Sequence, residues 1–273
     1  MRAAAARRAR GRAGSAGGFT LVELVVVIVV LGILSVGTVR FLRDAGDGYA
    51  SSAQRAELGS NARLAIERLS RDLHTALPNS VRVSGECIEY VPVVAAATYQ
   101  AVPVAMSATS FKASPLTTIG SLASVRVAVH PDDPSTLYGL PSPGAISPGA
   151  TFSAPDASNW ITVSLAASHR FAAESAQKRL FVVGTPVSYC VAAGRLYRYQ
   201  DYGFVALQPT PATLPTGVPQ RAVVADDVLA GAAPFTYSGA VENRNAVVKV
   251  TLAFGSGADQ LAVDHLVQLR NVP

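Results

Sequence analysis

The chain has 273 residues, of which 49% are apolar and 15% charged, a composition that excludes an intrinsically disordered protein. Its formal net charge of +5 comes from five arginines within residues 1–18, a stretch that holds no acidic residue. Without them the 23 basic residues fall to 18, which equals the 18 acidic residues and argues against a general nucleic-acid-binding surface.

Directly after this basic stretch, residues 19–39 form an apolar run of 21 residues that carries one charge, Glu23. As a helix at ~1.5 Å per residue the run measures about 31 Å, which is enough to cross the hydrocarbon core of a bilayer. Arginines before the run and none within it predict a cytoplasmic N-terminus, with the rest of the chain on the other side of the membrane.

Three kinds of segment combine a basic start with an apolar run. A secretory signal peptide has a shorter apolar core that ends in a small-residue cleavage site, and this sequence has neither feature. A plain signal anchor explains the hydrophobicity and the orientation, but it gives no reason for the carboxylate of Glu23 four residues after Phe19. The third kind is a prepilin signal, which residues 17–34 resemble.

The stretch GGFTLVELVVVIVVLGIL, residues 17–34, resembles the class III signal of type IV pilins and type II secretion pseudopilins. In that family a membrane-embedded peptidase cuts after the glycine and methylates the new amino terminus. The resemblance implies a leader of residues 1–18, a cut between Gly18 and Phe19, and an N-methylated Phe19. It also implies that residues 19–40 are the transmembrane and filament-assembly helix.

The positions at this cut have a physical rationale. Gly18 has no side chain, so an extended backbone can lie close to the catalytic groups of a peptidase. A carboxylate at the centre of a membrane helix costs roughly 2.5–3.5 kcal/mol, so we expect Glu23 to have a partner. Cleavage creates one, the ammonium of Phe19 on a neighbouring subunit. The alternative is that Glu23 reaches the membrane interface and pairs with nothing.

Residues 41–78 continue the helix with a polar, amphipathic pattern, and we expect Gly46 and Gly48 to loosen it. Pro78 is expected to end it. Apolar residues recur there at three- and four-residue steps, which predicts one buried stripe: Ala62, Ile66, Leu69, Leu73 and Leu77. The charged residues beside this stripe are expected to face solvent: Glu67, Arg68, Arg71 and Asp72.

Beyond Pro78 the sequence is strand-like, with short β-branched and aromatic runs between turns. Expected strands cover residues 80–83, 87–94, 125–129, 160–165 and 180–183, followed by a hairpin of 187–191 with 195–200 and a final antiparallel pair of 245–254 with 261–269. Two proline-rich stretches, 131–158 and 209–219, are expected to be exposed loops. One long helix followed by about six to nine strands indicates an α+β fold.

Three further stretches resemble the MshO-type minor pilins of mannose-sensitive haemagglutinin (MSHA) pili: LAIERLSRDLHTALPNSVRV, VSYCVAAGRLYRYQ and HLVQLRNVP. They are also similar to PilW-type minor pilins and to J-type pseudopilins of type II secretion. The pilin-like resemblance implies a long N-terminal helix packed on the antiparallel sheet of a periplasmic head, residues 79–273. It further implies a single-pass protein of the bacterial inner membrane that later enters a pilus.

The resemblance also implies the partners of such a structural subunit. They are the prepilin peptidase, other major and minor pilins, the inner-membrane assembly platform and membrane lipid. The size of the chain favours a minor rather than a major subunit. A filament-tip adhesin or other binding module is the alternative from a different functional class.

Cys87 and Cys190 both lie beyond the apolar run. If this part of the chain is outside the cytoplasm, a disulfide between them is allowed. It would close a loop of about 100 residues, worth roughly 4–5 kcal/mol in the chain-entropy account. The alternative is two buried free thiols.

The sequence offers no catalytic constellation. Its four histidines, at positions 74, 130, 169 and 265, form no HExxH and no other metal-ligand spacing. No G-x-S-x-G, P-loop or Rossmann signature occurs. We therefore expect no enzymatic activity, no cofactor and no metal.

Two groups of residues have an alternative ligand-binding interpretation. Aspartates could offer oxygens to calcium, but they lack EF-hand spacing and are better explained as turn residues: Asp132, Asp133, Asp226, Asp227 and Asp259. Aromatic residues near Arg195 and Arg198 could stack on bases or sugars, but cross-strand packing is the simpler explanation: Tyr197, Tyr199, Tyr202 and Phe204.

Overall fold

The computed structural model describes residues 18–116, 124–132, 134–229, 231, 233–239, 245–256 and 259–269. Predictions for the leader before Gly18, and for Asp133, therefore lie outside the described residues. The chain forms two compact units, 1–53 and 54–273, and each is described by itself. The predicted α+β fold, one long N-terminal apolar helix followed by antiparallel β-sheets, is confirmed.

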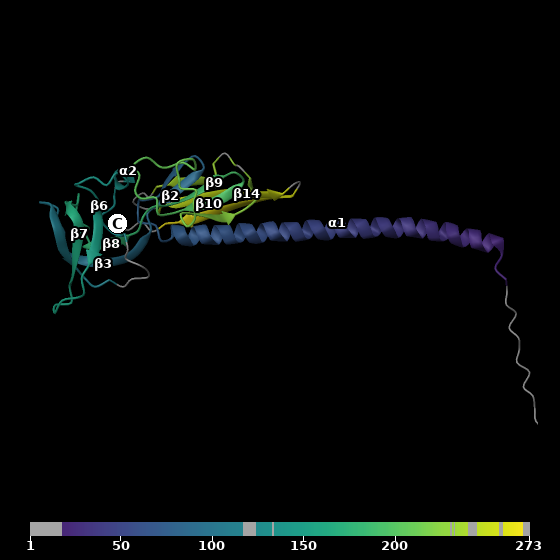
Figure 1. The fold of residues 1–273 in the computed structure, drawn as a ribbon, viewed down its shortest axis with the longest axis horizontal. Helices are drawn as coiled ribbons and strands as arrows, with labels where there is room; N and C mark the ends of the chain where they lie inside the picture. The colour runs from purple at the N-terminus through teal and green to yellow at the C-terminus, as the bar shows by residue number, and fades with distance from the viewer. Residues whose placement is uncertain are drawn as a thin grey trace, which may run out of the picture. The chain divides into compact units, whose positions relative to one another are not determined.

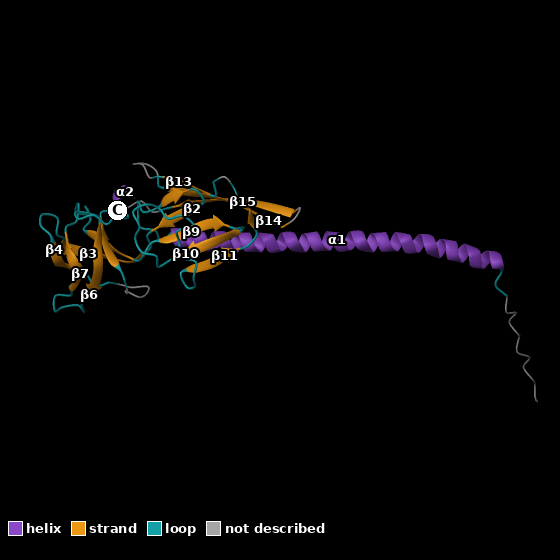
Figure 2. Cartoon of the chain, turned by 45° about the horizontal axis from the view of Figure 1, so that its top comes forward, coloured by secondary structure: helices purple, strands orange, loops and turns teal. Residues whose placement is uncertain are grey.

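The described residues form two helices and fifteen strands (Figures 1 and 2). The helices are α1 (Leu21–Leu73) and α2 (Pro134–Leu137). The strands are β1 (Arg82–Ser84), β2 (Cys87–Tyr90), β3 (Val93–Ala101), β4 (Ala108–Ala113), β5 (Arg126–Val129), β6 (Ile146–Phe152), β7 (Ile161–His169), β8 (Arg179–Val183), β9 (Val187–Ala192), β10 (Arg195–Tyr199), β11 (Arg221–Ala225), β12 (Val228–Leu229), β13 (Phe235–Ser238), β14 (Val247–Ser256) and β15 (Asp259–Gln268).

Helix α1 runs through Gly46 and Gly48 without a break. The expectation that these residues loosen it stays a prediction about the stability of the helix. A Cβ built on either glycine meets nothing within 4 Å, so packing does not require a glycine at these positions. The helix ends at Leu73, five residues before the predicted stop at Pro78. The predicted stripe is confirmed, because all of its members are buried: Ala62, Ile66, Leu69, Leu73 and Leu77.

Two antiparallel sheets bury the part of this stripe from Ala62 to Leu73. The five-stranded sheet has the order β1-β2-β9-β10-β11, and the predicted hairpin is its β9–β10 pair. In the second sheet β14 pairs with β12 and β13 on one side and with β15 on the other, which confirms the predicted final pair. Both sheets and residues 58–73 of α1 share one apolar core.

A closed six-stranded barrel is inserted between β2 and β9, in the order β3-β4-β7-β6-β5-β8. It has its own apolar core, which includes Val127, Val163 and Val182. Two expectations are wrong here. Residues 131–158 are not only loop, because they contain β6, and the predicted strand 87–94 divides into β2 and β3, which belong to different sheets.

The barrel is held against the end of α1 by its two connecting segments. The amide of Val93 donates to the carbonyl of Thr75 at 2.8 Å, and the amide of Gly184 donates to the carbonyl of Pro92 at 2.9 Å. A separate apolar cluster at this junction contains Leu77, Tyr138 and barrel residues from β5, β6 and β8. The barrel therefore shares a packed junction with the rest of this unit.

Candidate functional site

The first candidate site is the start of α1, where the sequence predicts a peptidase cut. Residues 18–20 are not helical, and the hydroxyl of Thr20 accepts a hydrogen bond of 3.2 Å from the amide of Glu23. Threonine as the N-cap, followed three residues later by glutamate, is the capping-box pattern. The Gly18–Phe19 bond therefore lies just outside the helix, and Phe19 is 72% exposed.

The fold does not require a glycine at position 18. A Cβ built on Gly18 meets no atom within 4 Å. If a glycine is needed at this position, the requirement must come from a molecule that binds the segment. This is the arrangement expected at a processing site rather than at a folding constraint.

Glu23 lies in the first turn of α1, where the positive end of the helix dipole favours a carboxylate. Among the residues that the structure describes, no cation lies within salt-bridge distance of it. Its charge is exposed on an otherwise apolar stretch of helix. A partner for this carboxylate would come from outside the described residues or from another molecule.

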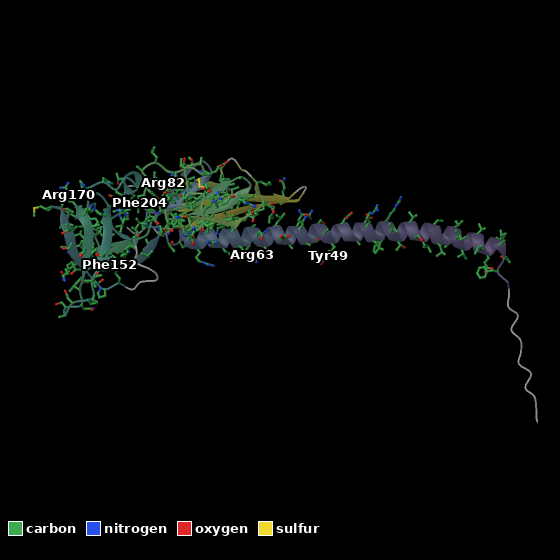
Figure 3. The ribbon with its side chains drawn as sticks, viewed as in Figure 1. Tyr49, Arg63, Arg82, Phe152, Arg170 and Phe204 are labelled. Carbon is green, nitrogen blue, oxygen red and sulfur yellow. A yellow bond between two sulfur atoms is a disulfide. The ribbon has the colours of Figure 1, made fainter. Side chains whose placement is uncertain are left out.

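The apolar stretch of α1 is exposed on all sides, as Figure 3 shows for its side chains. Within the described residues, one helix is long and apolar enough to span a membrane, and it is α1. Its polar groups are satisfied locally, because the hydroxyls of Ser35 and Thr38 donate to the carbonyls of Leu31 and Leu34 at 2.6 and 2.8 Å. Such local bonds are what a low-dielectric environment requires.

In the head, Cys87 and Cys190 face each other on the neighbouring strands β2 and β9 and are joined by a disulfide. Their Cα atoms are 4.2 Å apart, and both side chains are buried. The side-chain Nε2 of Gln208 donates to the carbonyl of Cys87 at 3.1 Å. The proline-rich loop of residues 209–219 therefore begins beside this disulfide.

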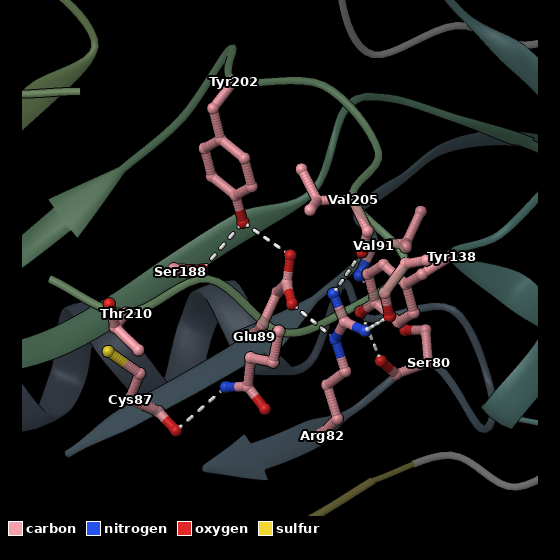
Figure 4. A network of polar contacts seen from close by, with 12 residues as sticks. Ser80, Arg82, Cys87, Glu89, Val91, Tyr138, Ser188, Tyr202, Val205 and Thr210 are labelled. Carbon is pink, nitrogen blue, oxygen red and sulfur yellow. Dashed lines mark hydrogen bonds and ion pairs between the residues drawn. The ribbon is translucent and has the colours of Figure 1, made fainter. Parts of the chain in front are cut away.

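The second candidate site is a buried polar network around Glu89, which sequence reasoning did not find (Figure 4). The guanidinium of Arg82 donates to one carboxylate oxygen of Glu89 at 2.5 Å, and the hydroxyl of Tyr202 donates to the other at 2.9 Å. Burial raises the pKa of Glu89, while the bonds from Arg82 and Tyr202 oppose this shift. Burial also raises the pKa of Tyr202, as does the nearby charge of Glu89.

Arg82 connects this network to a neighbouring loop and to the barrel junction. Its remaining nitrogens donate to the carbonyls of Val205 and Ala206 at 2.7 and 2.6 Å. Its guanidinium carbon lies 3.5 Å from the ring centroid of Tyr138, whose hydroxyl donates to the carbonyl of Ser80. All these polar groups are already paired, so the network stabilises the head and offers no group poised for chemistry.

The sequence contained a signal for this pair. Arg82 and Glu89 are directly opposite each other in the β1–β2 register, and the turn between them is short. Opposite charges at facing positions of a hairpin form cross-strand pairs. The predicted strands 80–83 and 87–94 could therefore have placed Arg82 opposite Glu89, although burial of the pair depends on the loop after β10.

The prediction that Asp72 faces solvent is wrong. One carboxylate oxygen of Asp72 accepts from Arg198 Nε at 2.8 Å and from the hydroxyl of Tyr189 at 2.7 Å. Burial and the charge of Asp72 raise the pKa of Tyr189. This cluster joins the end of α1 to β9 and β10, whereas Glu67, Arg68 and Arg71 are exposed as expected.

The residues with a possible ligand role are dispersed. No group of three or more His, Cys, Asp or Glu side chains within the described ranges could hold a metal ion. Asp226 forms an exposed ion pair with Arg195 at 2.6 Å, and Asp227 has a positive φ, typical of a turn. The side chain of Asp259 is outside the described residues.

The aromatic residues near Arg195 and Arg198 are used for packing. Tyr197 and Tyr199 are buried beside the disulfide, in a cluster that Tyr202 also contacts. The ring centroid of Phe204 lies 6.2 Å from that of Tyr138, with the two rings tilted by 47°, at the junction with the barrel. The packing interpretation therefore accounts for the aromatic residues that could otherwise have stacked on a ligand.

Comparison with known families found one match, and it covers the first candidate site, at the start of α1. Residues 15–39 match the family described as the prokaryotic N-terminal methylation motif, a type IV pilin-like signal. No curated protein and no solved structure matches the chain. The matched residues include Gly18, Phe19 and Glu23, so the motif covers the start of α1 and most of its apolar stretch.

Proposed function

We propose that this chain, which carries a type IV pilin-like methylation signal on a membrane-compatible helix, is a structural minor pilin of the MshO type. In this role it is assembled into an MSHA-type pilus or primes assembly of that pilus. The observation that carries the proposal is the match of residues 15–39 to the methylation motif, positioned so that the Gly18–Phe19 bond lies outside α1. The role is structural rather than enzymatic.

Processing is the first step of the proposed function. Prepilin peptidase cuts after Gly18, and Phe19 is then N-methylated. The exposure of Phe19 and the open space around Gly18 support this step, because a peptidase can reach the bond without unwinding the helix. The leader is then residues 1–18, and the transmembrane and assembly helix is residues 19–40.

Assembly is the second step. The new ammonium at Phe19 of one subunit pairs with Glu23 of its neighbour, while the exposed apolar side chains of residues 19–40 pack against other pilin helices. The absence of a described cation near Glu23 supports an external partner. An unpaired carboxylate in lipid costs roughly 2.5–3.5 kcal/mol at a helix centre, which favours assembly through this pair.

The proposed location is the bacterial inner membrane, with residues 41–78 and the head of residues 79–273 in the periplasm. The disulfide between Cys87 and Cys190 supports this side of the membrane, because disulfides persist in oxidising compartments. After assembly the chain is part of the pilus, and its partners are other major and minor pilins and the inner-membrane assembly platform.

The inserted barrel supports a minor subunit, because a head with a second β-domain is bulky for a filament shaft. The methylation motif supports a PilW-type minor pilin or a J-type pseudopilin of type II secretion equally well. A deletion strain separates these roles, and the same strain complemented with the full chain is the control that should restore the lost phenotype. Our proposal predicts loss of surface pili with normal protein secretion, whereas loss of type II secretion with normal piliation would overturn the MSHA assignment.

A further inference from the structure

The first part of α1 carries few charges, and they are grouped. Residues 19–53 belong to the first compact unit and contain five charged side chains, all of them exposed. One is Glu23, and the other four follow directly after the apolar run: Arg40, Arg43, Asp44 and Asp47. At about 100° per residue the five fall within about 160° of the helix circumference, so they lie on one side of α1.

The four charges after the apolar run form no ion pair with each other or with any other residue that the structure describes. Their spacing of four residues suits two pairs within the helix, Arg40 with Asp44 and Arg43 with Asp47. In both pairs, however, the basic residue precedes the acidic one, which is the less favourable order along a helix. These four side chains are therefore available to a partner outside this chain.

The unbroken helix fixes the distance between this group of charges and Glu23. Helix α1 runs from Leu21 to Leu73 without a break (Figure 1), so Asp44 lies 21 residues beyond Glu23, which is about 31 Å along the axis. When two such helices pack along their apolar stretches, a single axial shift sets which charges meet at both ends.

A second copy of the same helix is complementary to the first at one particular shift. When two parallel copies are displaced by four residues, which is about 6 Å, no like charges meet. Three pairs of opposite charge come into register at this shift: the ammonium of Phe19 with Glu23, Arg40 with Asp44, and Arg43 with Asp47.

Other shifts lack this complementarity. Copies with no shift place each charge opposite its own kind, and a shift of three residues places the two arginines opposite each other and Asp44 opposite Asp47. Every remaining shift matches at most one pair of opposite charges. Lipid phosphates would satisfy the arginines but leave the carboxylates unpaired. The occupant that supplies all the partners is therefore a second copy of this chain.

We propose that α1 of a second copy packs parallel to α1 of the first with a displacement of four residues. Two ion pairs then join the copies beyond the apolar run: Arg40 with Asp44, and Arg43 with Asp47. Packed apolar helices lower the local dielectric constant, which strengthens both pairs. The inference rests on the proposed function, because the third pair needs the amino terminus that cleavage creates. It adds the axial shift between neighbouring subunits and the residues that set it.

Charge exchange between two copies tests these pairs. An acidic variant carries Arg40→Asp and Arg43→Asp, and a basic variant carries Asp44→Arg and Asp47→Arg. Full chains with two different affinity tags are produced together in the host, and the fraction of one that is isolated with the other from a mild detergent extract is measured. Each variant should associate with itself about tenfold less than the parent chain does, because both pairs become repulsive.

The mixture of the acidic and the basic variant should recover the association of the parent chain, because each arginine again meets a carboxylate. A defect in folding or membrane insertion cannot produce this recovery. The matched control, Arg40→Lys with Arg43→Lys, keeps both charges and should associate like the parent. The inference is overturned by loss without recovery, which would mean that these charges meet lipid, a different subunit or their own helix. Undiminished self-association of either variant overturns it as well.

Cysteine cross-linking tests the axial shift. Ile33 and Gly37 are four residues apart in the exposed apolar run, and a Cβ at Gly37 meets nothing within 4 Å. A copy with Ile33→Cys and a copy with Gly37→Cys should form a mixed disulfide under mild oxidation faster than two copies of either variant. A mixture that cross-links no faster than the two identical pairs contradicts the shift of four residues.

These outcomes are separable from a failure of the proposed function. Leader removal is read from the intact mass of the same samples, and entry into pili is read from the sheared pilus fraction. A chain that is processed and enters pili, but whose acidic and basic variants do not restore each other, contradicts only the inference about this shift. A parent chain that keeps its leader contradicts the proposed function itself.

Discussion

Thr20 and Glu23 together begin α1, because the hydroxyl of Thr20 accepts the amide hydrogen bond of Glu23 at 3.2 Å. The helix thus starts two residues after the Gly18–Phe19 bond and places a carboxylate in its first turn. The two functions that we propose for this segment, access for a peptidase and a charge for assembly, are separated by one capped turn. The first two predictions test these functions independently.

Replacing Gly18 with arginine should block maturation without disturbing the fold. The structure has open space around this position, so the effect must arise in the peptidase and not in folding. Mass spectrometry of the membrane fraction should find only the precursor. Gly32→Ala is the control, because Gly32 also has open space around it and lies outside the cut. A normal mature mass for Gly18→Arg would refute the cleavage assignment.

Replacing Glu23 with alanine should allow processing but impair assembly. The variant keeps Gly18, Phe19 and the Thr20 cap, so the peptidase should cut it normally. It loses the carboxylate that is proposed to pair with a neighbouring ammonium, so we expect piliation to fall at least tenfold. Glu23→Gln, which preserves size without charge, should behave in the same way. Unchanged piliation in both variants would show that the pairing role is wrong.

Removing the buried carboxylate at position 89 should destabilise the head. Glu89→Leu leaves Arg82 without its carboxylate and Tyr202 without its acceptor, and breaking a buried pair costs about 3–5 kcal/mol. Denaturant unfolding of the full chain in detergent measures this loss. Asp226→Asn, which breaks an exposed pair with Arg195, should have a much smaller effect on stability, because solvent screens that pair. Equal losses would contradict the role assigned to the network.

The barrel should lose stability on acidification through His169. This side chain is buried, its Nε2 lies 3.2 Å from the carbonyl of Gly144, and burial lowers its pKa from the usual 6.5. The unfolded chain therefore binds a proton at a higher pH than the folded chain. The free energy of unfolding should fall as the pH drops below about 6.5, and it should stop falling below the pKa of the folded state.

The comparison that isolates this effect is between the parent chain and His169→Gln, each unfolded at several pH values between 5 and 8. Glutamine should lower stability at neutral pH but remove the part of the pH dependence that His169 contributes. A difference between the two chains that is independent of pH would mean that the pKa of His169 is the same in the folded and unfolded states, which contradicts the prediction.

Local sequence patterns predicted the elements whose contacts are close in sequence. The stripe that includes Ile66 and Leu73, the β9–β10 hairpin and the β14–β15 pair all follow from spacing and turn residues. The barrel could not be predicted in this way, because its closure depends on pairings such as β3 with β8, far apart in the chain. Strand β6 was missed because its proline and glycine, Pro148 and Gly149, resemble loop residues.

The two candidate sites also differ in whether the sequence could predict them. The processing segment is contiguous, so its residues could be named from the sequence. The Glu89 network and the pairing of Asp72 with Arg198 join residues that are more than 100 positions apart. Sequence spacing indicates which side of α1 carries Asp72, but not which strand lies opposite. For that reason the solvent-facing interpretation of Asp72 failed while the apolar stripe was correct.

The most direct measurement is the intact mass of the protein extracted from the membranes of its own host. The account predicts a chain that begins at Phe19, carries one added methyl group and has Cys87 and Cys190 oxidised. A chain that retains its arginine-rich residues 1–18 would contradict the account. It would leave a membrane-tethered head with no route into a filament.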